Sequence, residues 1–148
     1  MQMKTSLFNK LWATHPKKDF PCDEETFPNQ CAIRMSVALD KSGIDTSSFD
    51  KMYPSRRCYP GFKHSPRHIL AAQELANWIK NETVLFGHVE IIKNASRKDF
   101  VGRKGIVFIK DGWGPTDHID VWNGTFMQGG EGAYLSRGKE VWFWEITK

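Results

Sequence analysis

A cysteine and a histidine occupy positions where they could act as a nucleophile and its base. Cys31 begins an amphipathic segment, residues 31–42, that reads as a helix. In the first turn of a helix, N–H groups without intrahelical partners and the positive end of the dipole favour a thiolate over a thiol. His118 lies in the alternating segment 117–122, which is typical of a half-buried strand. The pair predicts acyl-transfer chemistry, in which the imidazole stabilises the thiolate and then protonates the leaving amine.

Each of these side chains also has a simpler interpretation. Cys31 could pack a helix end as a small apolar residue, and His118 could be a surface histidine on a strand. The other histidines suit a catalytic base less well, because they lie in a proline-rich loop, near a helix start or in a connector: His15, His64, His68 and His88. The backbone N–H of Cys31 is a further group that could help to stabilise an oxyanion.

The elements that must position Cys31 and His118 follow from hydrophobic periodicity. Helices are predicted at residues 5–14, 31–42 and 66–81, the last with Ser65 as cap. Strands are predicted at 104–110, 117–122 and 141–147, and a strand or a short extended connector at 89–92. A turn is predicted at 111–116 and a loop at 125–139. Because helices precede strands, we expect one α+β domain over residues 1–148, with N-terminal helices packed on a C-terminal antiparallel sheet.

The strand that carries His118 has two different faces. Alternation places His118, Asp120 and Trp122 on one face, and Ile119 and Val121 on the other. We expect the apolar pair to face the helices. The face with His118 is then expected to look into a cleft or into water.

The charge of the chain permits an anionic partner without requiring one. The net charge is +4, from 21 basic and 17 acidic residues in 148. A solvated surface is the first interpretation of the basic residues near the middle of the chain. A cleft rim that binds an acidic substrate is the second, and a nucleic-acid surface the third. These residues are Arg56, Arg57, Lys63 and Arg67.

The cysteines and the N-terminus restrict cofactors and location. Cys22, Cys31 and Cys58 form no C-x-x-C pair and are not spaced like zinc ligands, so we expect no metal and no cofactor. If Cys31 is the reactive cysteine, Cys22 and Cys58 are either free thiols or a pair that forms after export, and the sequence leaves both open. The first residues are too polar for a signal peptide, and no stretch approaches the ~20 apolar residues of a membrane span. We therefore expect synthesis in the cytoplasm, no membrane insertion, and any export by a route that ignores signal peptides.

Two segments resemble the fourth family of type VI secretion amidase effectors. The first is Asn-Gln-Cys-Ala-Ile-Arg-Met-Ser-Val-Ala-Leu at 29–39, and the second is Gly-Trp at 112–113 with His-Ile-Asp-Val-Trp-Asn-Gly at 118–124. Phe-Val-Gly-Arg-Lys-Gly-Ile-Val, from residue 100, is also similar. The cysteine and histidine motifs are specific in combination, although either alone would be weak. Residues 43–80 carry no matching motif.

The resemblance implies a papain-like, NlpC-type cysteine amidase in which Cys31 matches the nucleophile and His118 the base. Such an enzyme would cut peptidoglycan stem peptides between D-glutamate and meso-diaminopimelate, without a cofactor. It would be carried by a type VI apparatus into the periplasm of a rival bacterium. The implied partners are the stem peptide, a component of that apparatus and a cognate immunity protein that blocks the cleft, and nucleic acid is not among them.

The third catalytic group of this family is an acid shortly after the Trp-Asn-Gly turn, where this chain has glycine. Two substitutes are available. Asp120 shares the strand face of His118 but is not well aimed at the far ring nitrogen, whereas Glu131 could reach that nitrogen if its loop folds back. We favour Asp120. Because a third group only orients the imidazole, this choice does not affect the assignment of Cys31 and His118.

Two other functions remain open at the level of sequence. An acyltransferase or deamidase toxin that acts on a protein would use the same Cys–His pair but would leave peptidoglycan sacculi intact. A toxin that binds nucleic acid through the basic loop would not need Cys31 at all.

Overall fold

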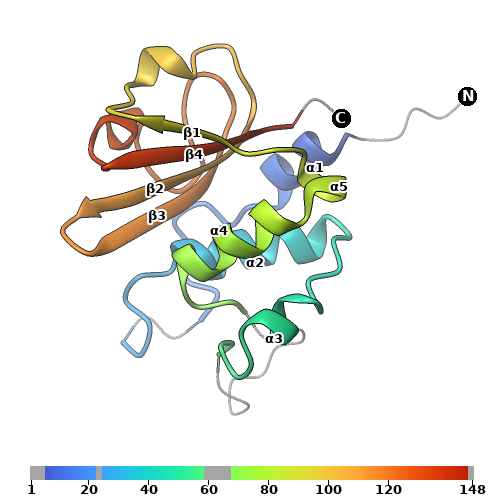
Figure 1. Cartoon of the computed structure of the whole chain (residues 1–148). Helices are drawn as coiled ribbons and strands as arrows, with labels where there is room; N and C mark the ends of the chain where they lie inside the picture. Colours follow the sequence, from blue (N-terminus) through green and yellow to red (C-terminus); the bar gives the residue numbers. More distant parts are fainter. Residues whose placement is uncertain (1–5, 23–24, 59–67, 147–148) are drawn as a thin grey trace, which may run out of the picture.

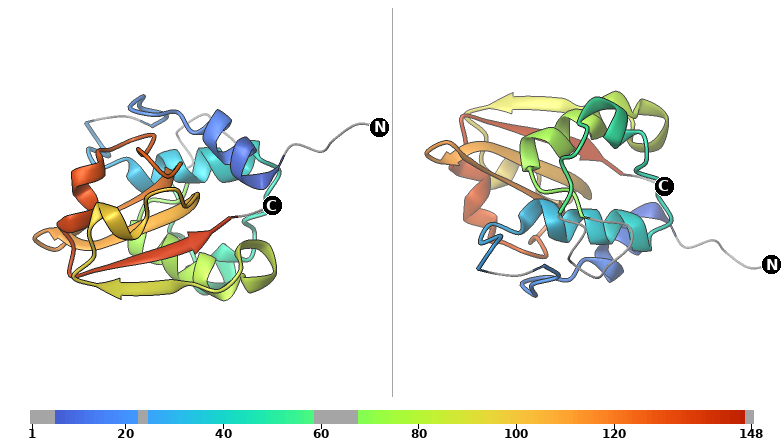
Figure 2. Two further views of the ribbon diagram at one scale, coloured as in Figure 1. Left: turned by 90° about the horizontal axis from the view of Figure 1, so that it is seen from above. Right: turned by 90° about the horizontal axis from the view of Figure 1, so that it is seen from below.

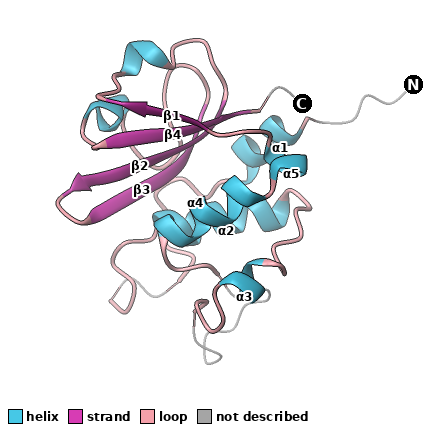
Figure 3. Cartoon of the chain, in the orientation of Figure 1, coloured by secondary structure: helices cyan, strands magenta, loops and turns pink. Residues whose placement is uncertain are grey.

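Helices come first and a four-stranded sheet follows, as the order of hydrophobic patterns predicts (Figures 1 and 3). The computed structural model describes residues 6–22, 25–58 and 68–146. The helices are α1 (Leu7–Thr14), α2 (Cys31–Lys41), α3 (Phe49–Met52), α4 (Ala72–Asn81) and α5 (Thr83–Phe86). The strands and 3₁₀ turns are β1 (Glu90–Lys93), η1 (Arg97–Asp99), β2 (Gly105–Trp113), β3 (Thr116–Trp122), η2 (Gly132–Ser136) and β4 (Glu140–Glu145). The α+β prediction is therefore confirmed.

The sheet is antiparallel throughout, in the order β1-β4-β2-β3. β3 is an edge strand, and it packs beside α2. In the views from above and below, α2 runs alongside the edge of the sheet that β3 forms (Figure 2). The start of α2 and the strand with His118 are therefore neighbours, although they are far apart in the sequence.

Both faces of the sheet are buried. Ile119 and Val121 lie in the core shared with the helices, as the alternation predicts. The opposite face carries a second apolar cluster, which includes Trp122 and Phe100, and the indole N–H of Trp122 donates to the Phe100 carbonyl oxygen at 2.9 Å. The face with His118 was expected to look into a cleft or water. Only its first part does so, because residues from the loops on either side of β2 and β3 cover the rest.

Helix α2 is the central helix of the structure, and eight of its eleven residues are buried. Its C-terminus is where the sequence predicts, because Gly43 adopts a positive φ of 84° just after the last turn. Its N-terminus is Cys31. Burial on nearly all sides fixes the position of that cysteine relative to the sheet.

The third predicted helix begins later than we expected. Helix α4 starts at Ala72 rather than at Pro66, and Ser65 and Pro66 lie outside the described residues. Ile69 falls within the predicted helix 66–81. It is buried, but it lies in an extended segment that forms an antiparallel bridge with Arg57. Pairing with a distant segment has overridden the local helical pattern.

Within the described residues, the helices are too short or too polar to cross a bilayer.

Candidate active site

The thiol of Cys31 lies at the N-terminus of α2, beside the start of β3. The cysteine is 5% exposed, and its Sγ donates to the Asp117 carbonyl oxygen at 3.7 Å. Its backbone N–H donates to Asn29 Oδ1 at 3.3 Å, a long hydrogen bond. The N–H group that we expected to stabilise an oxyanion is therefore directed at an asparagine side chain.

Cys31 and His118 line the same cleft, which has a volume of about 390 Å³. One wall comes from the start of α2 and the loop before it, and the other from β2, β3 and the loops after β3. The remaining lining residues are Pro28, Asn29, Gln30, Arg34, Trp113, Thr116, Asp117, Gly129 and Tyr134. The cleft gives a substrate access to the thiol and the imidazole together.

Hydrogen bonds hold His118 on both sides of its ring. Its Nε2 lies 2.8 Å from Asp120 Oδ2, which leaves Nδ1 for the hydrogen bond with the Cys31 thiol. Burial lowers the pKa of His118, but the hydrogen bonds and charges of Asp120 and Cys31 raise it more, to about 10. At neutral pH the imidazole is therefore protonated and can donate a proton.

Two aromatic side chains flank the imidazole. The ring of Tyr134, from η2, lies edge-on to His118 with centroids 5.2 Å apart, and the ring of Trp113 lies 5.9 Å away. Trp113 and Tyr134 also contact each other at 4.8 Å. These rings restrict the rotation of the imidazole and keep water from one side of it.

The Asp120 carboxylate is fully buried and surrounded by donors. Oδ1 accepts from the Val121 N–H at 2.8 Å, and both oxygens accept from the Gly129 N–H, at 3.1 and 3.0 Å. Together with the hydrogen bond to His118, these N–H donors compensate for the cost of removing the carboxylate from water. Asp120, rather than Glu131, thus contacts the imidazole, and Glu131 is exposed at the start of η2.

His15 is a fourth member of this arrangement that we had set aside from the sequence. It is 4% exposed, and its Nε2 lies 3.4 Å from Asp120 Oδ1. Its Nδ1 accepts from the Lys17 N–H at 2.9 Å, so the ring proton is on Nε2 and points at Asp120. Burial lowers the pKa of His15, despite the charge of Asp120, so the ring is neutral. In the sequence, nothing but its residue type indicated that His15 belongs to the site, because it lies in an irregular loop.

The Gly129 backbone lies against the Asp120 carboxylate. A Cβ atom at residue 129 would approach Asp120 Oδ2 at 3.3 Å, His15 Cε1 at 3.2 Å and the Lys17 carbonyl oxygen at 3.1 Å. Asp120 and His15 thus fill the space that a side chain at 129 would need. The absence of a side chain at Gly129 therefore allows its loop, β3 and the loop after α1 to approach one another closely.

A second Cys–His pair lies elsewhere, between Cys22 and His68. Cys22 Sγ is 3.0 Å from His68 Nδ1, and Cys58 is adjacent. Burial and the neighbouring Cys58 raise the pKa of the Cys22 thiol to about 12, so it is protonated at neutral pH. The residues that line the cleft beside Cys31 do not include this pair. Cys22 is therefore a poor nucleophile.

The described part of the basic cluster is paired with carboxylates. Arg56 Nε lies 2.9 Å from Glu74 Oε1, and Arg57 Nε lies 2.9 Å from Asp50 Oδ1. Lys63 and Arg67 lie outside the described residues. The two paired arginines favour a solvated surface over a nucleic-acid site.

Residues 27–144 match the family described as type VI secretion system (T6SS), amidase effector protein 4, abbreviated Tae4. The structure is similar to the effector in the Tae4–Tai4 effector–immunity complex from Enterobacter cloacae, with a TM-score of 0.71, 19% identity, and coverage of 97% of this chain and 100% of that chain. It is also similar to Tae4 from Salmonella typhimurium in complex with the immunity protein Tai4 from Enterobacter cloacae, with a TM-score of 0.72, 22% identity, and coverage of 97% and 100%. At these identities the structural matches show a common fold. No curated protein sequence matches the chain.

The high pKa of His118 makes stability depend on pH. Because the folded-state pKa is about 10 and the unfolded value is about 6.5, the contribution of this proton is complete below pH 6.5. It declines as pH rises above 6.5 and is lost above about 10. We expect NMR titration of the ring to show protonated His118 at pH 8 in the wild type, and a lower pKa in Asp120→Asn and Cys31→Ala. A wild-type midpoint near 6.5 would contradict this prediction.

Removing the His15 donor should impair the placement of Asp120. We expect His15→Leu to lower kcat about tenfold with little change in KM, because the polar contact of His15 with Asp120, behind the imidazole, is lost and the cleft is kept. His15→Gln, which can still donate to Asp120, should recover most of the rate. Equal losses in both variants, in steady-state assays with both proteins folded by circular dichroism, would exclude this role.

Proposed function

The chain belongs to the Tae4 family of type VI secretion amidase effectors, and from this we propose that it cuts stem peptides between D-glutamate and meso-diaminopimelate with Cys31, His118 and Asp120. As a member, it is a hydrolase, a peptidoglycan amidase toxin that the type VI apparatus secretes, and it has the papain-like, NlpC-type fold. The bond cleaved and the residues that act are the proposal. The observation that carries it is that Cys31 and His118 face one cleft, while Asp120 holds the imidazole at 2.8 Å.

The first half of the reaction forms a thioester. The Cys31 thiolate attacks the γ-carbonyl carbon of D-glutamate, and the carbonyl oxygen becomes an oxyanion. The Cys31 N–H can stabilise that charge, because its present hydrogen bond to Asn29 is long and can be exchanged. His118 then gives its proton to the diaminopimelate nitrogen as the C–N bond breaks. The amine leaves, and the acyl group stays on sulfur.

The second half of the reaction restores the enzyme. His118, now neutral, accepts a proton from a water molecule in the cleft, and the resulting hydroxide attacks the thioester carbonyl. The carbon–sulfur bond breaks and releases the D-glutamate γ-carboxyl group. The thiolate and the protonated imidazole are recovered, so the net reaction consumes one water molecule per bond.

Asp120 is the proposed orienting group, in place of the acid that the family resemblance implies near residue 129. The Gly129 N–H binds the Asp120 carboxylate, and a side chain at 129 would enter the space that Asp120 occupies. The Asp120 carboxylate, on β3, thus lies close to the space that a side chain at residue 129 would occupy. From there it can orient His118. The absence of an acid at 129 does not weaken the Cys–His assignment.

The cleft offers one group of each charge to a peptide. Arg34, on α2, lines the cleft, and its Nε and Nη2 donate to the carbonyl oxygens of Asp19 and Lys18 at 2.8 and 3.0 Å, so Nη1 is the group that would meet a ligand. Asp117 lies at the start of β3. A stem peptide at the proposed bond carries a free carboxylate on D-glutamate and an amino group on diaminopimelate. Arg34 would bind the carboxylate and Asp117 the amino group, which would favour this peptide over an uncharged one.

Delivery and protection follow from the same assignment. The target is the periplasm of a rival cell, where stem peptides are accessible. The matched structures named above are complexes of Tae4 with Tai4. We infer that a cognate immunity protein covers the cleft of this chain in the producing cell.

Purified sacculi test the proposed activity. Wild type should release fragments whose new termini, identified by mass spectrometry, are D-glutamate and meso-diaminopimelate, and Cys31→Ala should release none, because no thiolate is left to attack. Cys22→Ala, which removes a different thiol, should stay active. Intact sacculi with the wild type, or cleavage at another bond, would refute the proposed function. Transfer to or deamidation of a protein would then be the remaining Cys–His reaction.

The two candidate acids can be separated by matched amides. We expect Asp120→Asn to lower kcat by about 10²–10⁴, because the imidazole loses both its orientation and a charge partner. Glu131→Gln should retain the wild-type rate, because Glu131 is exposed. Initial rates on sacculi measure both. A loss in Glu131→Gln with an active Asp120→Asn would reverse the assignment.

A further inference from the structure

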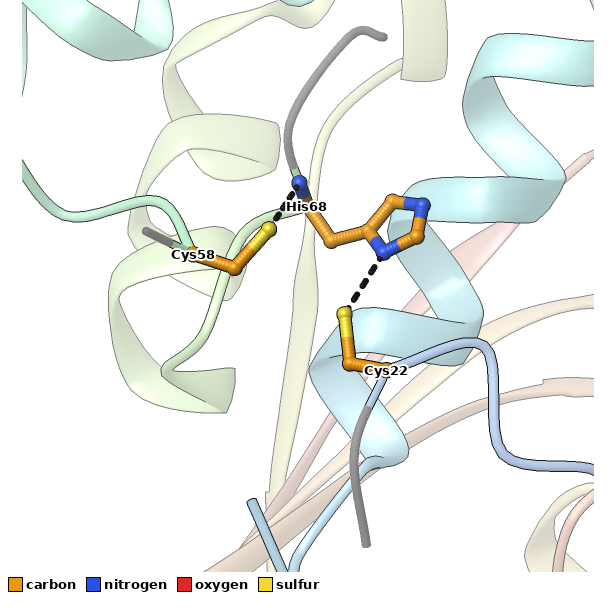
Figure 4. A group of neighbouring side chains, drawn as sticks. All are labelled: Cys22, Cys58 and His68. Carbon is orange, nitrogen blue, oxygen red and sulfur yellow. Dashed lines mark hydrogen bonds between the residues drawn. The ribbon is translucent and has the colours of Figure 1, made fainter. Parts of the chain in front are cut away.

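Two cysteines and a histidine meet in a group of their own, which Figure 4 shows. Cys22 comes from the loop before α2, Cys58 from the chain after α3, and His68 from the segment before α4. The two Sγ atoms and a ring nitrogen of His68 all lie within 4.8 Å of one another, and Nδ1 is the nitrogen beside Cys22 Sγ. The mechanism above uses none of these three side chains.

We propose that Cys22, Cys58 and His68 bind a zinc ion, with the two Sγ atoms and Nδ1 as ligands and a water molecule in the fourth position. In a tetrahedral site with Zn–S and Zn–N bonds of about 2.3 and 2.0 Å, ligand atoms are roughly 3.5–3.8 Å apart. Cys22 Sγ and His68 Nδ1 are 3.0 Å apart, so they would separate by about half an ångström. Binding converts two thiols into zinc-bound thiolates and releases two protons.

Backbone hydrogen bonds hold the three ligands in place before any ion binds. The Cys58 N–H donates to the His68 carbonyl oxygen at 2.9 Å, and the His68 N–H donates to Cys58 Sγ at 3.2 Å. Cys22 is fixed by Gln30, whose Nε2 donates to the Cys22 carbonyl oxygen at 2.8 Å. The N–H···S bond would also stabilise charge on a zinc-bound thiolate.

The donor set and its surroundings select a soft divalent ion. Two thiolates and an imidazole suit zinc, whereas magnesium and calcium require oxygen ligands. Cys22 and Cys58 are buried in a small apolar cluster with Ile33 of α2, against which Phe27 and Leu70 pack. This low-dielectric shell strengthens the attraction between the ion and the thiolates.

The site would brace the loop that leads to the active-site cysteine. Gln30 is 2% exposed, binds the backbone of Cys22, lines the cleft and directly precedes Cys31. An ion bound at Cys22 would thereby fix both ends of the 22–30 loop. The zinc site is structural and does not touch the proposed reaction.

Metal content of the full chain, purified in a reducing buffer, tests the proposal without an activity assay. We expect about one zinc ion per chain by mass spectrometry of the metal, and a thiolate-to-cobalt charge-transfer band after replacement by Co²⁺. Cys31→Ser should retain both, because Cys22 and Cys58 are then the only thiols in the chain. Zinc should raise the melting temperature of Cys31→Ser by roughly 5–10 °C over the chelator-treated protein.

Matched substitutions assign the ligands. The double variant Cys22→Ser/Cys58→Ser should lose the zinc and the cobalt band, and His68→Ala should weaken binding at least about tenfold. His88→Ala, which changes an exposed histidine, should bind as the wild type does. Zinc content no higher than that of the double variant, or no cobalt–thiolate band in Cys31→Ser, would overturn the proposal. Cys31→Ser leaves the three proposed ligands unchanged. Its zinc content and cobalt band therefore still test the proposal if the double variant does not fold.

Discussion

A single buried carboxylate, Asp120, holds together the end of the structure that carries the candidate active site. It is fully buried, and a carboxylate in that position is stable only if donors surround it, since an uncompensated buried charge costs several kcal/mol. Its donors come from β3 and from the loop at Gly129, and the His15 ring, from the loop after α1, lies 3.4 Å from it. β3, the loop that follows it and the distant loop of His15 thus meet around one charge, and the imidazole of His118 is fixed with them.

The packing of α2 on β3 decides whether the thiol and the imidazole can meet. Helix α2 is buried on nearly all sides, and both faces of the sheet are covered, so neither element can slide without exposing apolar surface. Cys31 is placed by the first turn of the helix and His118 by the register of β3 against β2. The cleft arises where these two rigid elements end, which suits a reaction that depends on placement within a fraction of an ångström.

The three cysteines have separate surroundings and therefore separate chemistry. Cys31 is next to a protonated imidazole at the edge of a cleft, whereas Cys22 and Cys58 are next to each other in an apolar cluster. The first environment supports a nucleophile, and the second supports a protonated thiol or a metal ligand. Residue type alone does not distinguish these cases, because the difference lies in which charges and ligand atoms surround each sulfur.

Local patterns in the sequence determined the central helix α2, the strands of the sheet and the two motifs of the family. The helical period of α2, the glycine after it and the alternation of β3 are properties of neighbouring residues. The sequence therefore predicts both elements, and it predicts that Cys31 begins the helix and that His118 lies on the strand. Partners across long separations could not be read. Three contacts depend on packing between segments: His15 with Asp120, Cys22 and Cys58 with His68, and the bridge of Ile69 with Arg57, after which α4 begins. Burial and hydrogen bonding between segments decide these contacts, and neither can be predicted from the pattern of neighbouring residues.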